Sequence, residues 1–152
     1  MTSATLDTVA PLLPTTTKAS TVPGFVTAGP KVLLRLEGLA MLIAGVVGYR
    51  ALGGTWGFFA AAFLVPDLSM LGYLAGAKVG AFFYNAAHNL IGPALLAGLG
   101  LLTGSSLALW CTLIWVAHIG FDRAMGYGLK YGSTFFDTHL GKVGRQQPGQ
   151  AH

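Results

Sequence analysis

Four polar residues interrupt a long apolar stretch in the middle of the chain. Residues 80–96 contain Tyr84, Asn85, His88 and Asn89, which recur at offsets of three or four. On a helix of about 3.6 residues per turn, this spacing places them in one polar stripe. Polar groups are costly inside a bilayer, so a stripe of this kind is a candidate functional site.

Two histidines have the chemistry of a divalent metal site. His118 and Asp122 are one helical turn apart and share a helix face, and His88 lies in the stripe. Two neutral imidazoles with a carboxylate, from Asp122 or Asp67, suit zinc or another divalent metal. We therefore expect His88, His118 and Asp122 as metal ligands, with zinc favoured. The alternatives are no cofactor, with these residues only joining two helices, and a bis-histidine haem, which the polar surroundings disfavour.

Carboxylates and amides near these ligands are candidate catalytic groups. Asp67 follows Pro66 inside an apolar run, where it could act as a general base or only cap a kinked helix. Glu37 could act in catalysis or pair with a neighbouring cation. Asn85 and Asn89 could stabilise a developing oxyanion, or they could only bond neighbouring helices.

Cationic and phenolic side chains are candidates for substrate binding. Arg123 could bind a phosphate or carboxylate, or serve only as a membrane anchor. Tyr84 and Tyr127 could orient a substrate, although tyrosines are common at membrane interfaces. Lys130, in the glycine-rich segment after residue 125, belongs to the same candidate set. Several aromatic residues could line an apolar substrate slot or only pack: Phe82, Phe83, Trp110, Trp115 and Phe121.

These side chains must be positioned by membrane-spanning helices. Of the 152 residues, 53% are hydrophobic and 9% are charged, whereas soluble domains carry roughly 25% charged residues. We expect an all-α fold, a four-helix transmembrane bundle with spans at about 32–52, 56–77, 80–102 and 107–125. The spans lie in a membrane domain at 29–142. Residues 1–28 are expected to be a disordered tail, and residues 143–152 a loose tail.

The topology predicts where the polar residues meet. Four spans place both termini on one side, which also receives most of the lysines and arginines, so that side is predicted to be cytoplasmic. Because successive spans alternate in direction, the polar residues of the spans then all fall in the cytoplasmic half of the bundle: Glu37, Asp67, Asn85, His88, Asn89, His118, Asp122 and Arg123. The spans carry no ionisable residue in the other half. The sequence therefore predicts a polar pocket in a multi-pass protein of the cytoplasmic (inner) membrane.

Three classes of function fit this pocket. The first is a membrane enzyme, a metal-dependent hydrolase or an acid/base isomerase, acting on a lipid-like or other apolar small-molecule substrate. The second is a proton- or cation-coupled transporter or channel component, and the third is a structural or regulatory membrane protein. The expected partner is the lipid bilayer, with a homodimer left open. Nucleic acid is excluded because the basic residues are scattered.

Four motifs together resemble a known family. They are Arg35-Leu-Glu-Gly38, the run from Pro66 to Tyr73, Tyr84-Asn-x-x-His88-Asn89, and His118-x-x-x-Asp122-Arg123-x-x-Gly-Tyr-Gly-Leu-Lys130. They resemble the small bacterial membrane proteins of domain-of-unknown-function family 4260, over roughly residues 31–142. The resemblance implies a four-span membrane protein and no established activity. The His118-x-x-x-Asp122 element is also similar to elements of membrane metal-dependent hydrolases.

Overall fold

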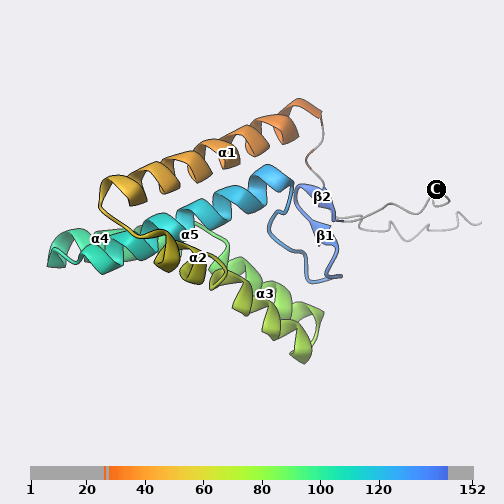
Figure 1. Ribbon diagram of the computed structural model, residues 1–152. Helices are drawn as coiled ribbons and strands as arrows, with labels where there is room; N and C mark the ends of the chain where they lie inside the picture. Colours follow the sequence, from red (N-terminus) through yellow and green to blue (C-terminus); the bar gives the residue numbers. More distant parts are fainter. Residues whose placement is uncertain (1–25, 27, 144–152) are drawn as a thin grey trace, which may run out of the picture.

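The structure, a computed structural model, is a bundle of helices with a short hairpin at its C-terminal end (Figure 1). It describes residue 26 and residues 28–143. The tails expected at 1–28 and 143–152 lie outside the described residues, apart from residues 26, 28 and 143. The elements are α1 (Ala28–Ala51), α2 (Trp56–Phe63), the 3₁₀ helix η1 (Pro66–Ala75), α3 (Ala77–Ala87), α4 (Ile91–Thr103), α5 (Ser106–Met125), β1 (Asp137–Thr138) and β2 (Gly141–Lys142).

The predicted transmembrane bundle is confirmed. The four expected spans correspond to α1, to α2 with η1, to α3 with α4, and to α5. Three helical stretches are long and apolar enough to cross a membrane: Gly29–Ala51, Trp56–Ala75 and Ala77–Thr103. The helix α5 is not among them. The cytoplasmic placement of the termini stays a prediction.

Glycines bring α1 and α5 into close contact along antiparallel paths (Figure 1). A Cβ atom on Gly120 would lie 2.5 Å from the backbone nitrogen of Leu42, and one on Gly45 would lie 2.7 Å from the carbonyl oxygen of Leu113. Only glycine permits such an approach between helix backbones, which is how many helices pack in lipid. Six residues of α5 are buried, more than in any other described helix, so the core centres on α5.

The second span changes its helix type where the sequence predicts an interruption. The helix α2 ends at Phe63, and η1 begins at Pro66 with Asp67 in its first turn. Proline cannot donate a backbone hydrogen bond, and the chain winds tighter beyond it. The amide of Asp67 accordingly donates to the carbonyl of Leu64, three residues back, at 3.2 Å.

The expectation of one continuous helix over residues 80–102 is wrong. The helix α3 ends at Ala87, and α4 starts at Ile91. Asn89 lies in the break, where its Oδ1 accepts a hydrogen bond from the backbone nitrogen of Ile91 at 2.7 Å. The indole of Trp115 donates to the carbonyl of Ala87 at 2.6 Å. These side chains satisfy backbone groups that the break exposes, which permits non-helical backbone within a membrane bundle.

A non-helical segment after α5 closes one end of the bundle. The strands β1 and β2 pair antiparallel, and Lys130 forms an isolated bridge with Thr138. The side chain of Asn85 fixes this segment to α3, because its amide nitrogen donates to the Lys130 carbonyl (2.8 Å) and its oxygen accepts from the Lys130 amide (2.7 Å). The frequent glycines of this segment disfavour helix, and the small hairpin was not predicted.

Candidate metal centre

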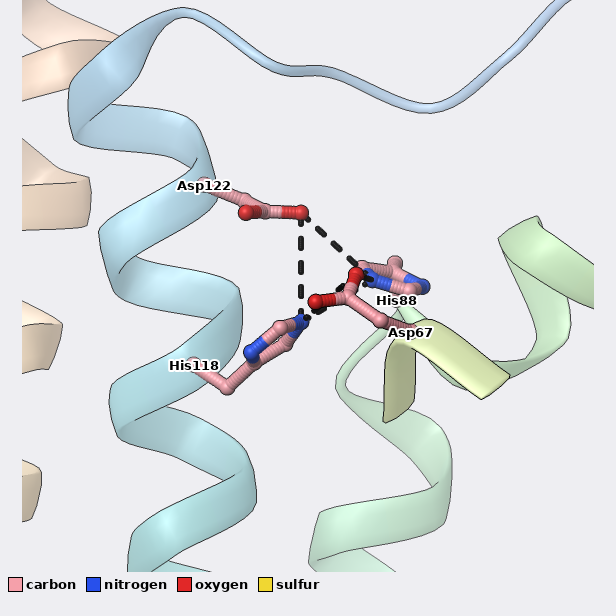
Figure 2. A group of neighbouring side chains, drawn as sticks. All are labelled: Asp67, His88, His118 and Asp122. Atoms are coloured by element: carbon pink, nitrogen blue, oxygen red, sulfur yellow. Dashed lines mark hydrogen bonds and ion pairs between the residues drawn. The ribbon is translucent and has the colours of Figure 1, made fainter. Parts of the chain in front are cut away.

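Four side chains with metal-binding atoms meet inside the bundle (Figure 2). Asp67 comes from the first turn of η1, His88 from the break between α3 and α4, and His118 and Asp122 from neighbouring turns of α5. One ligand atom from each residue lies within 4.8 Å of all the others. The arrangement brings together three parts of the chain, so it depends on the fold and not on a local motif.

The distances among these atoms match a metal coordination shell. The two Nε2 atoms of His88 and His118 are 3.1 Å apart. Asp67 Oδ1 lies 3.6 Å from each of them, and Asp122 Oδ2 lies 3.4 Å from His88 Nε2 and 4.0 Å from His118 Nε2. With metal–ligand bonds of about 2.0–2.2 Å, the corners of a tetrahedron stand about 3.3–3.6 Å apart. An ion therefore fits here after small adjustments.

His88 is fixed in the tautomer that a metal requires. Its Nδ1 lies 2.9 Å from the carbonyl oxygen of Tyr84. A carbonyl can only accept, so Nδ1 carries the proton and donates, which leaves the lone pair of Nε2 directed at the cluster. The Tyr84 ring also stacks on the imidazole, with ring centroids 3.8 Å apart.

Tyr84 orients a second ligand as well. Its hydroxyl donates a hydrogen bond to Asp122 Oδ2 at 2.9 Å. Hydrogen bonds from neighbouring groups commonly hold ligating carboxylates in place. Tyr84 therefore contacts two of the predicted metal ligands, and its side chain is buried.

His118 is held differently from His88. Its Nδ1 is buried and has no hydrogen-bond partner among the described residues. The ring instead packs edge-on against Phe63, with centroids 5.2 Å apart. Outside the cluster, packing thus positions His118, whereas a hydrogen bond and a stacked ring both position His88.

With both carboxylates ionised, the cluster carries negative charge that no directly paired lysine or arginine among the described residues neutralises, although the Lys130 ammonium is close enough to interact electrostatically with Asp122. Two carboxylates with two neutral imidazoles have a formal charge of −2. In the part of the chain that the structure describes, no lysine or arginine forms an ion pair with Asp67 or Asp122. The guanidinium of Arg123 is directed at the sulfur of Met41 (3.8 Å), and the Lys130 ammonium donates to the Phe135 carbonyl (2.9 Å). A divalent cation would neutralise this charge, which is otherwise expensive inside a membrane protein.

The four side chains of the cluster differ in how exposed they are to solvent. The side chains of His88 and His118 are 3% and 2% exposed, and that of Asp122 is 15% exposed. Asp67 is 38% exposed. The cluster is therefore accessible from the side of η1, where Asp67 lies.

The structure brings the predicted ligands His88, His118 and Asp122 together with Asp67, but it places other candidates elsewhere. The side-chain amide of Asn85 forms two hydrogen bonds with the backbone of Lys130. The side chain of Asn89 accepts a hydrogen bond from the backbone of Ile91, the first residue of α4. Glu37 is exposed on α1, outside the cluster.

The predicted substrate-binding residues divide into two groups. Tyr84, Tyr127 and Arg123 line a small cavity beside His88 and Asp122. The Lys130 ammonium lies over the rings of Phe135 and Tyr84, at 4.2 Å and 5.2 Å from their centroids. Lys130 itself is buried, and burial lowers the pKa of its ammonium from the usual value. The roles predicted for these residues stay predictions.

The helix break at His88 was not predicted from the sequence, although one residue indicated it. Pro93 is the third residue of α4. Proline is tolerated in the first turn of a helix, where the amides lack partners, and is disruptive in the interior. Its presence therefore indicated a new helix start near residue 90.

Comparison with other proteins identifies the family of this chain. No curated protein and no solved structure matches the chain. The family described as Domain of unknown function (DUF4260) matches residues 31–143, a region that includes all four residues of the cluster. The chain therefore belongs to this family, domain of unknown function 4260.

Proposed function

We propose that the protein is a membrane enzyme that binds one divalent metal ion and acts on a lipid-like substrate. The observation that carries this proposal is the set of four ligand atoms within 4.8 Å, whose two carboxylates form no ion pair with any described lysine or arginine. His88, His118 and Asp122 are the ligands, because they are the most enclosed. Asp67, on the open side, is the general base.

The donor set indicates the class of ion. Two imidazole nitrogens and carboxylate oxygens suit zinc, with manganese and iron as competitors. Held by His88, His118 and Asp122, such an ion would supply Lewis acidity toward a carbonyl or phosphoryl group and toward water. Asp67 would accept the proton released from that water, since its carboxylate is the most accessible one in the cluster. The reaction class we favour is hydrolysis of an ester, amide or phosphoester.

Metal analysis of the purified protein tests this proposal directly. Detergent-solubilised protein, prepared without chelators or a metal-affinity column, should contain close to one divalent ion per chain. His88→Gln and His118→Gln should lose the ion, because each removes a buried nitrogen ligand. Glu37→Gln serves as the matched control, since Glu37 lies outside the cluster, and it should retain the ion. Equal melting temperatures establish that the variants are folded.

Asp67→Asn separates metal binding from catalysis. We expect this variant to keep the ion and to lose hydrolysis of ester, amide or phosphoester lipids, because an amide cannot act as a base. Loss of the ion would make Asp67 a ligand and overturn its role as base. A wild-type protein without metal, or one whose metal survives both histidine substitutions, would overturn the whole proposal and leave a hydrogen-bonded cluster that joins helices.

A further inference from the structure

An apolar groove of about 450 Å³ lies between α2, the start of η1 and α5. All of its lining side chains are apolar or cysteine. Its volume lies within the range of roughly 300–1,000 Å³ that is typical of small-molecule sites. No predicted site residue lines it, apart from Trp115 of the aromatic set.

The groove has rigid walls and a floor of small residues. Trp115 forms one wall, held by its hydrogen bond to the Ala87 carbonyl. The same ring rests against Gly92, where a Cβ atom would lie 2.6 Å from it. Ala61 and Ala62, whose side chains are single methyl groups, line the groove from α2. The recess thus results from fixed packing around the helix break.

One end of the groove adjoins the metal centre. Pro66, in the lining, directly precedes Asp67 in the chain. Ile114, also in the lining, lies four residues before His118 on α5, which is one helical turn. A chain lying in the groove would therefore end beside the open, Asp67 side of the cluster.

The groove opens on a helical stretch that is apolar enough to cross a membrane. The α2 and η1 wall of the groove belongs to that stretch, Trp56–Ala75, and Val65 on the rim is 56% exposed. No described residue of the lining is charged. Hydrocarbon is the one medium that meets this opening and matches its lining.

We infer that the groove holds a hydrocarbon chain of a bilayer lipid that enters sideways from the membrane. The head-group linkage of that lipid then lies at the metal centre, a placement that rests on the proposed function. The inference narrows the substrate class from an apolar molecule to a membrane lipid. It also assigns the chain-binding contacts to α2 and α5.

Photocrosslinking in vesicles tests the inference. The protein is reconstituted into phosphatidylcholine vesicles that contain a small fraction of phosphatidylcholine with a photoreactive group at the end of one acyl chain. Crosslinked sites are then identified by peptide mass spectrometry. We expect enrichment at Cys111 and Ala62 over Leu74 and Leu102, although the last two are the most exposed hydrophobic residues at 88% and 89%.

A groove-filling substitution supplies the matched comparison. Ala62→Trp should lower crosslinking at Cys111 about tenfold, because overfilling a packed site excludes the chain. Ala60→Trp, on the exposed side of the same helix, should leave crosslinking at Cys111 unchanged. Labelling that simply follows exposure, or that is equal in the two variants, would overturn the inference.

The His118→Gln variant distinguishes failure of the groove from failure of the enzyme. The groove lining does not include His118, so chain crosslinking at Cys111 should persist there while the metal is lost. A protein that shows the enriched crosslinks but never contains metal would keep the lipid-binding groove and lose the proposed enzyme. Loss of crosslinking in this folded variant would overturn the groove as an independent binding site.

Discussion

Removing one hydroxyl should weaken metal binding without disturbing the ligands themselves. Tyr84→Phe deletes the O–H that donates to Asp122 Oδ2 at 2.9 Å. It keeps the ring that stacks on His88 at 3.8 Å, and it keeps the backbone carbonyl that accepts from His88 Nδ1. The perturbation therefore isolates a single hydrogen bond to a carboxylate.

The size of the effect follows from that bond. A hydrogen bond to a charged group contributes about 1.5–3 kcal/mol, and loss of groups that orient metal ligands typically costs about 10–100-fold in affinity. We expect the dissociation constant for zinc to rise by about 10–100-fold, since the Asp122 carboxylate is only 15% exposed and water replaces the donor poorly. Competition against a fluorescent chelator in detergent measures the constant.

Tyr73→Phe is the matched control. The Tyr73 hydroxyl is buried on η1 and has no hydrogen-bond partner among the described residues, so its removal should leave the affinity unchanged. Equal dissociation constants for wild type and a folded Tyr84→Phe variant would refute the reasoning, because Tyr84 would then orient no ligand. A similar loss in both variants would point to a general effect of tyrosine removal.

Three further predictions concern the scaffold. Gly120→Ala should lower the free energy of unfolding by about 1–3 kcal/mol through overpacking against α1, whereas Gly98→Ala, with open space around it, should be neutral or stabilising; thermal melts in detergent compare them. Asn85→Ala should speed hydrogen exchange in residues 128–142 by about tenfold or more, because it removes both hydrogen bonds to the Lys130 backbone, and unchanged exchange would contradict this. Burial lowers the pKa of His139, so the segment should be most stable above pH about 6.5 and lose stability as the pH falls below it; His139→Gln should abolish that dependence.

The sequence was informative about helices because membrane spans leave a strong compositional signal. The apolar runs predicted α1 and α5 to within a few residues, and Pro66 marked where α2 gives way to η1. Alternating span direction predicted that the four cluster residues lie in the same half of the bundle, but it placed Glu37 there as well, and the structure leaves Glu37 outside the cluster. That inference needs only the depth of each residue, which hydropathy supplies.

The break at residues 88–90 could not be found by periodicity. Offsets of three and four make Tyr84, Asn85, His88 and Asn89 resemble a stripe, whether the helix continues or stops. What ends α3 here is a set of non-local bonds, such as the one from the Trp115 indole to the Ala87 carbonyl. The hairpin at residues 137–142 was missed for the same reason, since main-chain pairing over two residues leaves no sequence period.

The helix α5 supplies two of the four cluster residues, yet it is not among the helices apolar enough to cross a membrane. It is also the last helix of the bundle to be synthesised. Earlier helices must therefore be in the bilayer first, and the glycine face of α1 has to remain available until α5 leaves the ribosome. The cluster can therefore form only after α5 has been made, because a chain that ends before α5 lacks His118 and Asp122.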